Sequence, residues 1–430
     1  MLVGSSVRRV AIVGGSRIPF ARSHGTYARV GNAEMLTAAL QAVVTRFGLD
    51  GVRLGEVAAG AVIKHSRDFN LARECVLGTT LDPHTPAFDL QRACGTSLEA
   101  AIGIANKIAL GQIDAGIAGG VDSVSDPPVV YGREYQQILL RAFRARSLGG
   151  RIAPFLSLRP RHFKPVIPDA SEPRTGLSMG ASCELMAQRW GITRAAQDEL
   201  AFESHRHAAA AWRDGFFDDL VVPFAGLQRD DNVRPDTSIE KLAGLRASFD
   251  RSAAGTLTAG NSTPLTDGAS AVLLASENWA RTRGLPILGW LSFGKAWAVD
   301  FERGAEGLLM APAYAVPAML ADAQLSLQDF DYYEIHEAFA AQVLCTLAAW
   351  ESAQFCRERL GLDAALGSIE RTRLNVRGSS LAIGHPFAAT GARILATLAK
   401  LLSQDGAARR GLISVCTAGG MGVTAIVERA

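Results

Sequence analysis

Hydrophobic residues along the chain follow two spacings, and the alternation of these spacings predicts strands and helices in turn. Short apolar runs at residues 10–13, 57–63 and 115–120 are typical of buried strands. Between these runs, apolar residues recur every three or four positions, which predicts helices over residues 33–47 and 71–77 and from the vicinity of Cys94 to Gly111. Strands and helices that alternate in this way indicate the layers of an α/β fold.

The same alternation returns in the last third of the chain. Strand-like runs lie at residues 286–293, 330–335, 412–415 and 424–427, and helical spacing is found over residues 311–323, 336–350 and 388–402. In the first part of the chain, a helix after Cys94 leads to a strand that ends at Gly120. In the last part, a helix after His385 leads to a strand that ends near Gly420. This echo suggests an internal duplication that places reactive groups at equivalent helix N-termini.

Residues 125–250 interrupt this pattern. They contain two further predicted helices, over residues 182–190 and 194–215, and a polar loop at residues 261–270 then leads into a strand at 271–275. Within the interruption, residues 131–164 hold eight Arg or Lys and one Glu, with Tyr, Ile, Leu and Phe interleaved. Two readings of this basic segment are open. It is either an amphipathic surface element that contacts a partner or a membrane, or a solvated loop that packs on its own domain.

Composition and charge narrow the choice of partners and compartment. The 430 residues are 48% hydrophobic and 20% charged, which suits a soluble chain of two or three domains. A net charge of +2 gives no overall attraction to nucleic acid or to a membrane. The chain has no run of about 18 apolar residues and no apolar leader of the signal-peptide kind, so we expect a cytoplasmic protein. Its six cysteines are scattered without a C-x-x-C pair, which favours reduced thiols over a disulfide framework or a zinc site.

Cys94 lies where an extended run turns into the start of a helix. Unpaired backbone N–H groups and the positive end of the helix dipole gather at such a place, and both favour a thiolate. We therefore predict a lowered pKa for the Cys94 thiol. The alternative is that Cys94, which stands beside small residues, is a buried apolar filler of the core.

Three further residues stand at comparable junctions of predicted strands, helices and turns. His336 follows the strand at 330–335, His385 precedes the helix at 388–402, and Cys416 follows the strand at 412–415. Folds of the α/β class place ligands at such ends of strands. Each residue also has a structural reading: His336 as a satisfied polar group, His385 as a helix cap, and Cys416 as packing among small neighbours. Two cysteines and two histidines in such positions favour a chemical role for the set over four separate structural roles.

Five motifs in a fixed order give the chain a resemblance to a known family. They are Arg-Ala-Cys94-Gly-Thr-Ser; Gly260-Asn261-Ser-Thr with Asp267-Gly268-Ala269; His336-Glu-Ala-Phe; Gly384-His385-Pro386 with Thr390-Gly391; and Cys416 with Gly419-Gly420 and Gly422. Through these motifs the chain, from about residue 8 to 428, resembles the thiolases, which are acetyl-CoA acyltransferases. His336 stands where most thiolases carry Asn. That variant and the basic segment 131–164 resemble the thiolase subunit of trifunctional β-oxidation complexes.

The resemblance implies a duplicated α-β-α-β-α layered fold, of the α/β class, with an inserted loop domain. Residues 1–124 and 251–283 would form an N-terminal half, and residues 284–430 would form a C-terminal half. Residues 125–250 would be the loop domain, which carries the basic segment 131–164. Because Cys94 comes from one half and the two histidines and Cys416 from the other, we expect the active site between the halves.

The resemblance also implies a reaction and a role for each site residue. The reaction is thiolytic cleavage of a 3-ketoacyl-CoA by CoA, which gives acetyl-CoA and a shortened acyl-CoA through an acyl thioester on Cys94. A thiol suits this task because it is both a nucleophile and a leaving group. His385 would be the base and Cys416 an acid and base. His336 and His385 would donate to the enolate oxygen, directly or through water, and the backbone N–H groups of Cys94 and Ala418 would form a second oxyanion hole.

By the same resemblance, Met179, Ser262 and Thr263 would line the channel for the pantetheine part of CoA, and arginines of residues 125–250 would meet the CoA phosphates. CoA is then a substrate, and we expect no permanently bound cofactor, no metal ion and no nucleic acid partner. We expect a homodimer or a tetramer. A hydratase/dehydrogenase subunit or a membrane surface would be the further partner of segment 131–164.

Three other functions remain open from the sequence. A biosynthetic acetoacetyl-CoA thiolase would run the reaction as a Claisen condensation. A decarboxylating condensing enzyme of related fold would use no second catalytic cysteine, and Cys416 in its glycine-rich turn argues against it. A scaffold subunit without activity would have no use for the four intact site residues.

Overall fold

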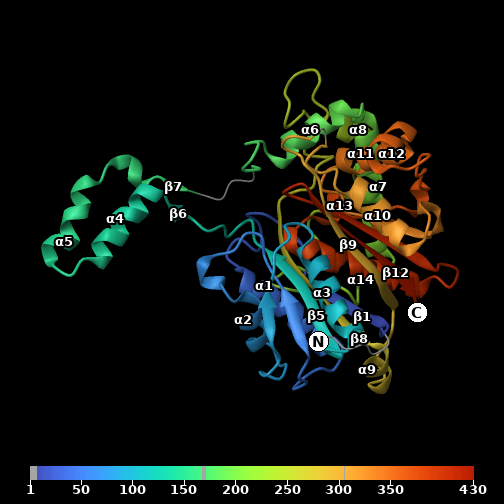
Figure 1. Cartoon of the computed structure of the whole chain (residues 1–430), viewed down its shortest axis with the longest axis horizontal. Helices are drawn as coiled ribbons and strands as arrows, with labels where there is room; N and C mark the ends of the chain where they lie inside the picture. Colours follow the sequence, from blue (N-terminus) through green and yellow to red (C-terminus); the bar gives the residue numbers. More distant parts are fainter. Residues whose placement is uncertain (1–6, 167–170, 305) are drawn as a thin grey trace.

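A large mixed sheet organises the computed structural model, which describes residues 7–166, 171–304 and 306–430 (Figure 1). The first six residues of the predicted N-terminal half lie outside the described residues. The strands lie in the order β10 (Tyr332–Ile335), β11 (Arg410–Thr417), β12 (Met421–Arg429), β9 (Gly289–Ala298), β1 (Val10–Arg17), β8 (Thr266–Ser276), β5 (Ala115–Asp122), β3 (Glu56–Ala59) and β4 (Ala87–Asp89), and β2 (Ala21–Arg22) pairs with β8.

The sheet consists of two similar halves that meet between β1 and β9. In the first half β3 and β5 are parallel, and β8 and β1 follow antiparallel to their neighbours. In the second half β10 and β11 are parallel, and β12 and β9 follow in the same manner. The halves are joined through the pairs Ala11 with Trp290 and Ile12 with Gly289. The predicted duplication therefore appears as a repeat of strand order and direction.

Helices form the layers that cover and separate the two halves. On the outer face of the first half, α1 (Asn32–Arg46) and α2 (Leu71–Leu77) pack on β1, β3, β5 and β8. On the outer face of the second half lie α10 (Pro312–Ala323) and α11 (Ala340–Glu351). Between the halves lie α3 (Thr96–Ala109) and α14 (Thr390–Gln404), whose apolar residues share one core with strands of both halves. The α-β-α-β-α layering predicted for the chain is thus confirmed.

The crossing of α3 and α14 is close because of a glycine. A Cβ atom on Gly391 would lie 2.4 Å from the backbone nitrogen of Leu98, so no larger residue fits at this point. The close crossing brings together the N-terminal ends of the two helices, one from each half. Cys94 lies just before α3, and His385 lies five residues before α14.

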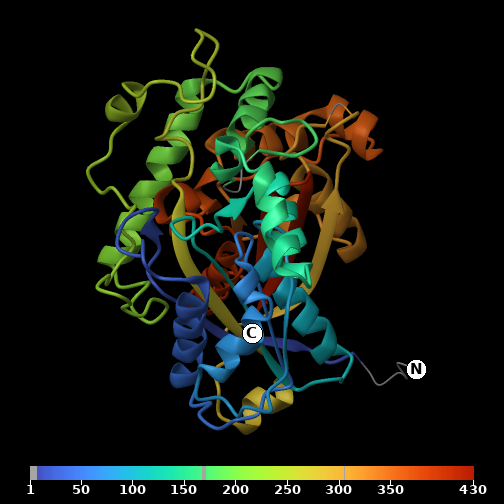
Figure 2. The same cartoon turned by 90° about the vertical axis from the view of Figure 1, so that its left-hand side faces the viewer.

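Part of the segment 125–250, which interrupts the α/β pattern of the sequence, forms a helical cap on the outside of the fold. It contains α6 (Met179–Arg189), α7 (Arg194–Arg213) and α8 (Ile239–Ala243), which lie beside α11 and α12 (Ala353–Leu360), away from α1 and α2 (Figures 1 and 2). A short helix, α13 (Ser380–Ile383), packs against α7. A further helix, α9 (Glu277–Thr282), follows β8. A buried ion pair between Arg17 of β1 and Asp230 ties this region to the sheet, with Nη2 to Oδ2 at 2.7 Å.

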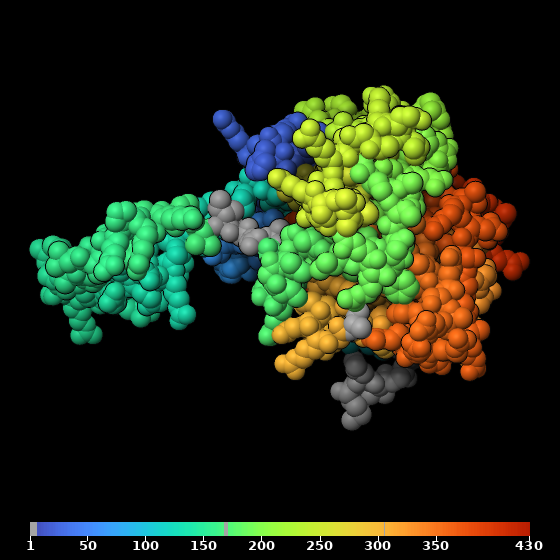
Figure 3. Space-filling model, turned by 90° about the horizontal axis from the view of Figure 1, so that it is seen from above, coloured from blue at the N-terminus to red at the C-terminus, as the bar shows by residue number. Residues whose placement is uncertain are grey.

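Residues 129–166 form an arm that projects from the body of the protein (Figures 1 and 3). Its base is the pair of strands β6 (Val130–Tyr131) and β7 (Pro165–Val166). Beyond the base lie α4 (Arg133–Arg144), α5 (Leu148–Ile152) and the short 3-10 helices η2 (Ala153–Ser157) and η3 (Pro160–Phe163). The arm has its own small interior, because Ile138, Ala142 and His162 are buried within it. The reading of this segment as a loop that packs on its own domain is therefore wrong.

Several predicted elements have other bounds in the structure; the strand predicted at residues 57–63, for example, is β3 and ends at Ala59. Three further differences have causes in tertiary contacts. β8 begins at Thr266, inside the predicted polar loop, because the Asp267 carboxylate accepts bonds from the backbone of Val124 and Ser125 and is satisfied within the fold. β9 covers Gly289–Ala298 rather than residues 286–293, since its full length pairs with β12. α11 begins at Ala340 rather than at residue 336. Among the described residues, no helix is long and apolar enough to cross a bilayer.

Candidate active site

Cys94 occupies a strained turn between β4 and α3. The preceding residue, Ala93, has a left-handed backbone with φ of +43°, which an L-residue adopts only when its surroundings enforce it. The Thr96 hydroxyl enforces the turn, since it accepts from the Arg92 N–H at 2.9 Å and donates to the Ala93 carbonyl at 2.7 Å. The turn presents the Cys94 thiol at the start of α3, as the sequence predicts, toward residues of the other half.

His385 contacts the Cys94 sulfur directly, with Nε2 3.1 Å from Sγ. Its other ring nitrogen lies 2.6 Å from the Thr390 hydroxyl, and its backbone N–H donates to the Thr266 hydroxyl at 2.6 Å. The imidazole is therefore held through both ring nitrogens, and the backbone bond fixes the residue itself. Burial lowers the pKa of His385 to about 3, with the nearby Arg393 charge adding to the effect. At neutral pH the ring is uncharged and can accept a proton from Cys94.

The predicted lowering of the Cys94 pKa is wrong for the free enzyme. Burial raises the pKa of this thiol to about 12, although the backbone N–H groups of Ala418 and Cys94 act in the opposite direction. The cost of placing a thiolate in this desolvated site exceeds the help from nearby N–H groups. The resting pair is thus a neutral thiol and a neutral imidazole, and the thiol loses its proton only as it reacts.

His336 lies immediately after β10, with its ring centroid 4.1 Å from that of His385. Its backbone N–H donates to the Ser414 carbonyl at 2.8 Å, which continues the pairing of β10 with β11 and holds the residue beside the sheet. This bond explains why α11 starts four residues later than predicted. His336 Nδ1 lies 2.9 Å from the Ser380 hydroxyl, while Nε2 is buried and makes no hydrogen bond to a described group.

Cys416 is the next-to-last residue of β11 and is buried. Burial raises the pKa of its thiol well above the ordinary value, and the neighbouring Cys94 sulfur adds to this effect, so the two sulfurs lie within electrostatic reach of each other. The turn that follows is open because Gly419 and Gly420 both have left-handed backbones, with φ of +78° and +69°. This turn directs the Ala418 N–H toward the Cys94 sulfur.

The predicted site residues therefore converge from both halves of the fold. Cys94 comes from the turn before α3, and His336, His385 and Cys416 come from ends of elements in the second half. The ligand atoms of Cys94, His336 and His385 all lie within 4.8 Å of one another. A thiol and two imidazoles at this spacing could also hold a metal ion. The predicted absence of a metal stays a prediction.

The three residues predicted to contact CoA lie beside this cluster. The loop that carries Ser262 and Thr263 runs along the loop after His336, where the Thr263 N–H donates to the Ala338 carbonyl at 3.1 Å. The Ser262 hydroxyl is buried and makes no hydrogen bond to a described group. Met179, the first residue of α6, packs against the apolar cluster that contains Cys416. All three thus lie near residues of the site, and their role toward CoA stays a prediction.

Several supporting residues escaped the sequence reading. Asp122, at the end of β5, accepts bonds from the backbone N–H groups of Val62, Ile63 and Ala388 and so anchors the turn after His385. Ser380 and Arg393 contact each other and lie behind His336. Thr390 was part of a quoted motif, but nothing in its spacing indicated that it would contact the His385 ring. A polar residue beside a histidine motif is the one signal that could have marked Ser380.

Comparison with protein families covers nearly the whole chain. Residues 10–278 match the thiolase N-terminal domain, and residues 296–429 match the thiolase C-terminal domain. The chain belongs to the thiolase family. The predicted resemblance is therefore confirmed, and the cysteines and histidines described above lie within the two matched regions of this thiolase.

Individual relatives of this thiolase are similar over nearly their full length. A 3-ketoacyl-CoA thiolase of Pectobacterium atrosepticum is 42% identical over 98% of this chain and 96% of its own length. One of Yersinia pestis is 40% identical over 98% of this chain and 97% of its own length. Among solved structures, the acetyl-CoA acetyltransferase of Bacillus anthracis has a TM-score of 0.81 at 29% identity, and human mitochondrial 3-ketoacyl-CoA thiolase has one of 0.79 at 26% identity. The two structures cover 99% of this chain, and their own chains are covered fully.

Proposed function

We propose that this thiolase cleaves 3-ketoacyl-CoA with CoA, as in fatty-acid β-oxidation, to give acetyl-CoA and a shortened acyl-CoA. The observation that carries the proposal is the contact between His385 Nε2 and Cys94 Sγ at 3.1 Å, with Cys416 and the Ala418 N–H beside it. The names of the two bacterial relatives support the same substrate class.

In the first half-reaction the Cys94 thiol attacks the C3 carbonyl of the substrate, and His385 takes the thiol proton. The backbone N–H groups of Cys94 and Ala418, which already point at the sulfur, would stabilise the tetrahedral oxyanion. The C2–C3 bond then breaks, and its electron pair forms the enolate of acetyl-CoA. Cys416 donates its thiol proton to C2, acetyl-CoA leaves, and the acyl group remains as a thioester on Cys94.

In the second half-reaction CoA takes the place of acetyl-CoA. The Cys416 thiolate takes the proton of the CoA thiol, and the CoA sulfur attacks the carbonyl of the acyl-Cys94 thioester. The Cys94 sulfur leaves and recovers its proton from His385, so both cysteines and the histidine return to their resting states. The neutral resting state of His385 suits this cycle, because the ring must first accept the proton and then return it.

The enolate needs its own donors, since its charge develops on the thioester oxygen of the acetyl group. We assign this task to His336 and His385, whose rings lie side by side in the site. We assign Met179, Ser262 and Thr263 to the pantetheine channel. The buried, unpaired hydroxyl of Ser262 supports this assignment, because such a group is costly unless a ligand or water satisfies it.

A replacement of the nucleophile tests the proposed function. The wild-type enzyme should form acetyl-CoA from acetoacetyl-CoA and CoA without a malonyl donor, and intact-mass measurement should detect an acyl adduct. Cys94→Ala should lose the adduct and at least about 10⁴-fold in kcat, as expected when a nucleophile is removed. An acyl adduct that persists in Cys94→Ala would refute the role of this residue. A requirement for a malonyl donor would instead identify a decarboxylating condensing enzyme.

Rates in both directions address the biosynthetic alternative. If the enzyme forms acetoacetyl-CoA from acetyl-CoA but fails to cleave longer 3-ketoacyl-CoA substrates, it is a biosynthetic acetoacetyl-CoA thiolase.

We further propose that no metal ion or bound cofactor takes part. Prolonged dialysis against a strong chelator should then leave kcat unchanged, and a loss that zinc restores would contradict this.

The division of the chain into parts is also a proposal. We assign residues 1–124 and 251–283 to the N-terminal half, residues 125–250 to the loop domain, and residues 284–430 to the C-terminal half. The position of β8 between β1 and β5 supports the assignment of residues 251–283. Limited proteolysis should cut first within residues 125–250 and leave the two halves associated.

We propose a cytoplasmic homo-oligomer, either a dimer or a tetramer. The six free cysteines support a reducing compartment, because the described chain contains no disulfide bond. β4 supports association, since it lies at the edge of the sheet and an unpaired edge can continue into a second copy. Light scattering on the purified protein gives the mass directly, and a monomer at micromolar concentration would contradict the proposal.

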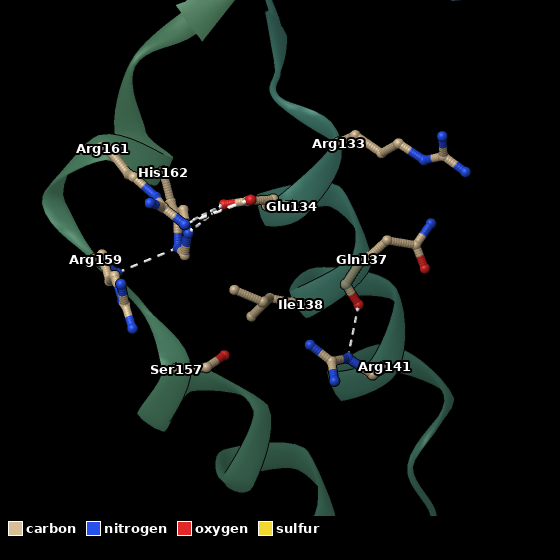
Figure 4. Close-up of a pocket in the computed structure, with 9 residues that line it drawn as sticks. All are labelled: Arg133, Glu134, Gln137, Ile138, Arg141, Ser157, Arg159, Arg161 and His162. Carbon is tan, nitrogen blue, oxygen red and sulfur yellow. Dashed lines mark hydrogen bonds and ion pairs between the residues drawn. The ribbon is translucent and has the colours of Figure 1, made fainter.

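The arm is proposed to be a docking element. Its residues 131–164 carry a net charge of +7, while the rest of the chain has −5. Phe143 and Leu156 are each 85% exposed, and Leu148 and Ile152 are also exposed in the outer part of the arm. Four arginines, Arg133, Arg141, Arg159 and Arg161, line an open groove of about 520 Å³ between α4 and η3 (Figure 4). A surface that combines exposed apolar groups with arginines is suited to an anionic membrane, because the apolar groups can leave water and the arginines can attract the lipid charges.

We therefore favour an anionic lipid surface over a hydratase/dehydrogenase subunit as the first partner of the arm. The wild-type protein should sediment with vesicles that contain phosphatidylglycerol and not with vesicles of phosphatidylcholine alone, and high salt should weaken the binding. Phe143→Ser with Leu156→Ser should abolish it. Phe69→Ser with Leu77→Ser, which removes the same two exposed residue types from the body of the protein, serves as the matched control.

Removal of residues 131–164 tests both partners together. The shortened enzyme should keep its fold and cleave acetoacetyl-CoA at the wild-type rate, because no site residue lies in the arm. If vesicle binding, oligomeric state and binding to a purified hydratase/dehydrogenase subunit all remain unchanged, the docking proposal is wrong. Loss of subunit binding alone would make that subunit, rather than a membrane, the partner.

A further inference from the structure

A buried polar network lies behind His336 and is not used in the mechanism above. The Ser380 hydroxyl, on α13, lies 2.9 Å from His336 Nδ1 and 2.8 Å from Nη2 of Arg393, on α14. Arg393 also donates through Nη1 to the Ser379 hydroxyl at 3.3 Å. His336, Ser380 and Arg393 are all nearly inaccessible to solvent. The network is therefore shielded from bulk water, and its hydrogen bonds form between these protein groups.

The direction of each hydrogen bond follows from the groups involved. A guanidinium group contains only donors, so the Ser380 oxygen must accept the bond from Arg393. Among the described groups, the remaining partner of the Ser380 hydroxyl is His336 Nδ1. A buried hydroxyl hydrogen without an acceptor is unfavourable, so this hydrogen points at Nδ1. Nδ1 is then the acceptor of the ring.

The proton of the His336 ring is consequently on Nε2. Burial, together with the His385 ring and the Arg393 charge, lowers the pKa of His336 well below its ordinary value, so the ring carries one proton at neutral pH. Nε2 is the ring nitrogen that is buried without a described hydrogen-bond partner. The ring lies in the cluster with Cys94 and His385. It thus offers an N–H donor to the site before any substrate arrives.

We propose that Ser380 and Arg393 are positioning residues, which lock His336 in its neutral Nε2–H form so that it can donate to the enolate oxygen. With the opposite tautomer, Nε2 would present a lone pair to an oxygen that is gaining negative charge, and the interaction would become repulsive. This role rests on the assignment of His336 to the enolate in the proposed function. Neither Ser380 nor Arg393 needs to contact the substrate.

Arg393 is well placed for such a task. It stands on α14, the helix between the two halves, where nearly every residue is buried. Glu334 of β10 and Glu337 both contribute attraction to its charge, and burial is the larger and opposing influence that lowers the pKa of Arg393 to about 10. The guanidinium group therefore stays charged at neutral pH. A fixed donor on a rigid helix leaves the Ser380 hydroxyl with little rotational freedom.

The proposal predicts that Ser380→Ala affects one chemical step and spares another. Cleavage of the C2–C3 bond creates the enolate, so kcat for acetoacetyl-CoA should fall by about 10-fold or more, toward the roughly 10²–10³-fold of a lost oxyanion donor. Exchange of labelled CoA into acetyl-CoA proceeds through acyl-Cys94 without an enolate. The exchange rate of the variant should stay within about twofold of the wild-type rate.

Two further variants complete the kinetic test. Ser380→Thr keeps a hydroxyl and should restore most of the cleavage rate. Ser414→Ala removes another buried hydroxyl close to His336, one that makes no hydrogen bond to a described group, and should leave both rates unchanged. Equal losses of cleavage and exchange in Ser380→Ala would overturn the proposal, because they would indicate a general disturbance of the site.

A spectroscopic measurement is independent of turnover. In protein labelled with ¹⁵N-histidine, the His336 ring nitrogens, assigned by comparison with His336→Asn, should show the Nε2–H tautomer in the wild-type enzyme. Ser380→Ala and Arg393→Met should show a mixture or the Nδ1–H form. An unchanged tautomer in both variants would overturn the proposal. This outcome can be told from a failure of the proposed function, in which the wild-type enzyme itself would show no thiolysis.

Discussion

At the scale of single residues, the proposed nucleophile of this site, Cys94, is uncharged at rest. Burial around Cys94 outweighs the backbone N–H groups that point at its sulfur, and the neighbouring His385 is neutral as well. The thiolate form is consequently rare near pH 7. In the proposed mechanism a separate thiolate–imidazolium pair need not form first, because the negative charge passes to the carbonyl oxygen, which the backbone N–H groups would stabilise, as the thiol attacks.

This resting state predicts the pH dependence of Cys94 alkylation. Because its thiol pKa is raised to about 12, the thiolate fraction should grow by about tenfold per pH unit throughout the range from pH 7 to 10. The rate of modification by iodoacetamide, followed by peptide mass mapping, should rise in the same way and reach no plateau. Cys94→Ser provides the background. A plateau below about pH 9 would mean that the site stabilises the thiolate after all.

Cys416 should separate the two halves of the catalytic cycle. In Cys416→Ser a weaker acid replaces the thiol that is proposed to protonate the enolate carbon, so kcat for cleavage should fall by about 10²–10⁴-fold. Cys94 and its oxyanion hole remain intact, and incubation with acetyl-CoA should still add an acetyl group to the protein by mass. If Cys416→Ser kept the full cleavage rate, another group would have to supply the proton.

Sequence patterns singled out the four residues that converge in the candidate site but not their electrostatics. Cys94, His336, His385 and Cys416 stand in local motifs that can be found without a structure. The effect of a helix N-terminus on Cys94 is also local and was counted, whereas burial depends on side chains from distant parts of the chain and was missed. Ser380 and Arg393 were overlooked for the same reason, because their contacts with His336 arise only when α13 and α14 fold behind β10.

At the scale of elements, loops rather than helices carry the site, and a buried carboxylate joins them. Glu337 accepts from the Ser204 hydroxyl of α7 at 2.7 Å, from the Asn375 side chain at 2.6 Å and from the Leu381 N–H of α13 at 3.2 Å. One side chain thus fixes the loop after β10, the loop before α13 and the cap relative to one another. The position of His336 depends on this junction.

Removal of this carboxylate should destabilise the fold and loosen the site. Glu337→Ala leaves three buried donors without an acceptor, so the free energy of unfolding should fall by about 3 kcal/mol or more. Urea denaturation followed by circular dichroism measures the change. Glu358→Ala, on the exposed side of α12, is the matched control and should change the free energy of unfolding by less than about 0.5 kcal/mol. A similar small effect for Glu337→Ala would contradict the junction.

Periodicity predicted most elements of the two halves, and the exceptions have tertiary causes. α1, α2 and α10 begin and end within one residue of the predicted positions because their apolar faces are regular. α11 was extended too far toward its N-terminus, since the apolar residues after His336 satisfy a helical spacing. In the fold the backbone at this point pairs instead with Ser414 and with the loop at Thr263. Such pairing between segments distant in sequence leaves no periodic signal.

At the scale of the whole molecule, the cap and the sheet are joined by one deeply buried ion pair. Arg17 and Asp230 form two parallel bonds, and Asp230 also accepts from the backbone of Phe20 and from the Trp212 ring nitrogen at 3.2 Å. Both charges are almost completely excluded from water. A pair of this kind is costly to break on one side only, because the other charge remains buried.

Asp230→Ala should therefore lower the free energy of unfolding by about 3–5 kcal/mol. Chemical denaturation measures the change. The exposed pair of Arg8 with Asp114 is the comparison, and Asp114→Ala should cost no more than about 1 kcal/mol. If both substitutions had the same small effect, the link between cap and sheet would have to be carried by other contacts.

The layered architecture followed from the sequence through its family resemblance, while the shape of the arm did not. The basic and apolar composition of residues 131–164 indicated a surface element. Composition alone could not tell whether the segment lies along the body or projects from it. The projection is possible because residues such as Tyr131, Tyr135 and Phe163 pack on one another, which gives the arm an interior of its own.

The position of β8 sets the order of events for the nascent chain. β8 lies between β1 and β5, yet Thr266 leaves the ribosome about 250 residues after Arg17, the end of β1. At a synthesis rate of about 5–20 residues per second, the edge of β1 waits roughly 10–50 s for β8, and the edge of β5, which ends at Asp122, waits roughly 7–30 s. During that interval Cys94 has no partner in place, because His385 and Cys416 have not yet been translated. Protection of the unfinished sheet in this interval is a task for the cell's chaperones rather than for the sequence itself.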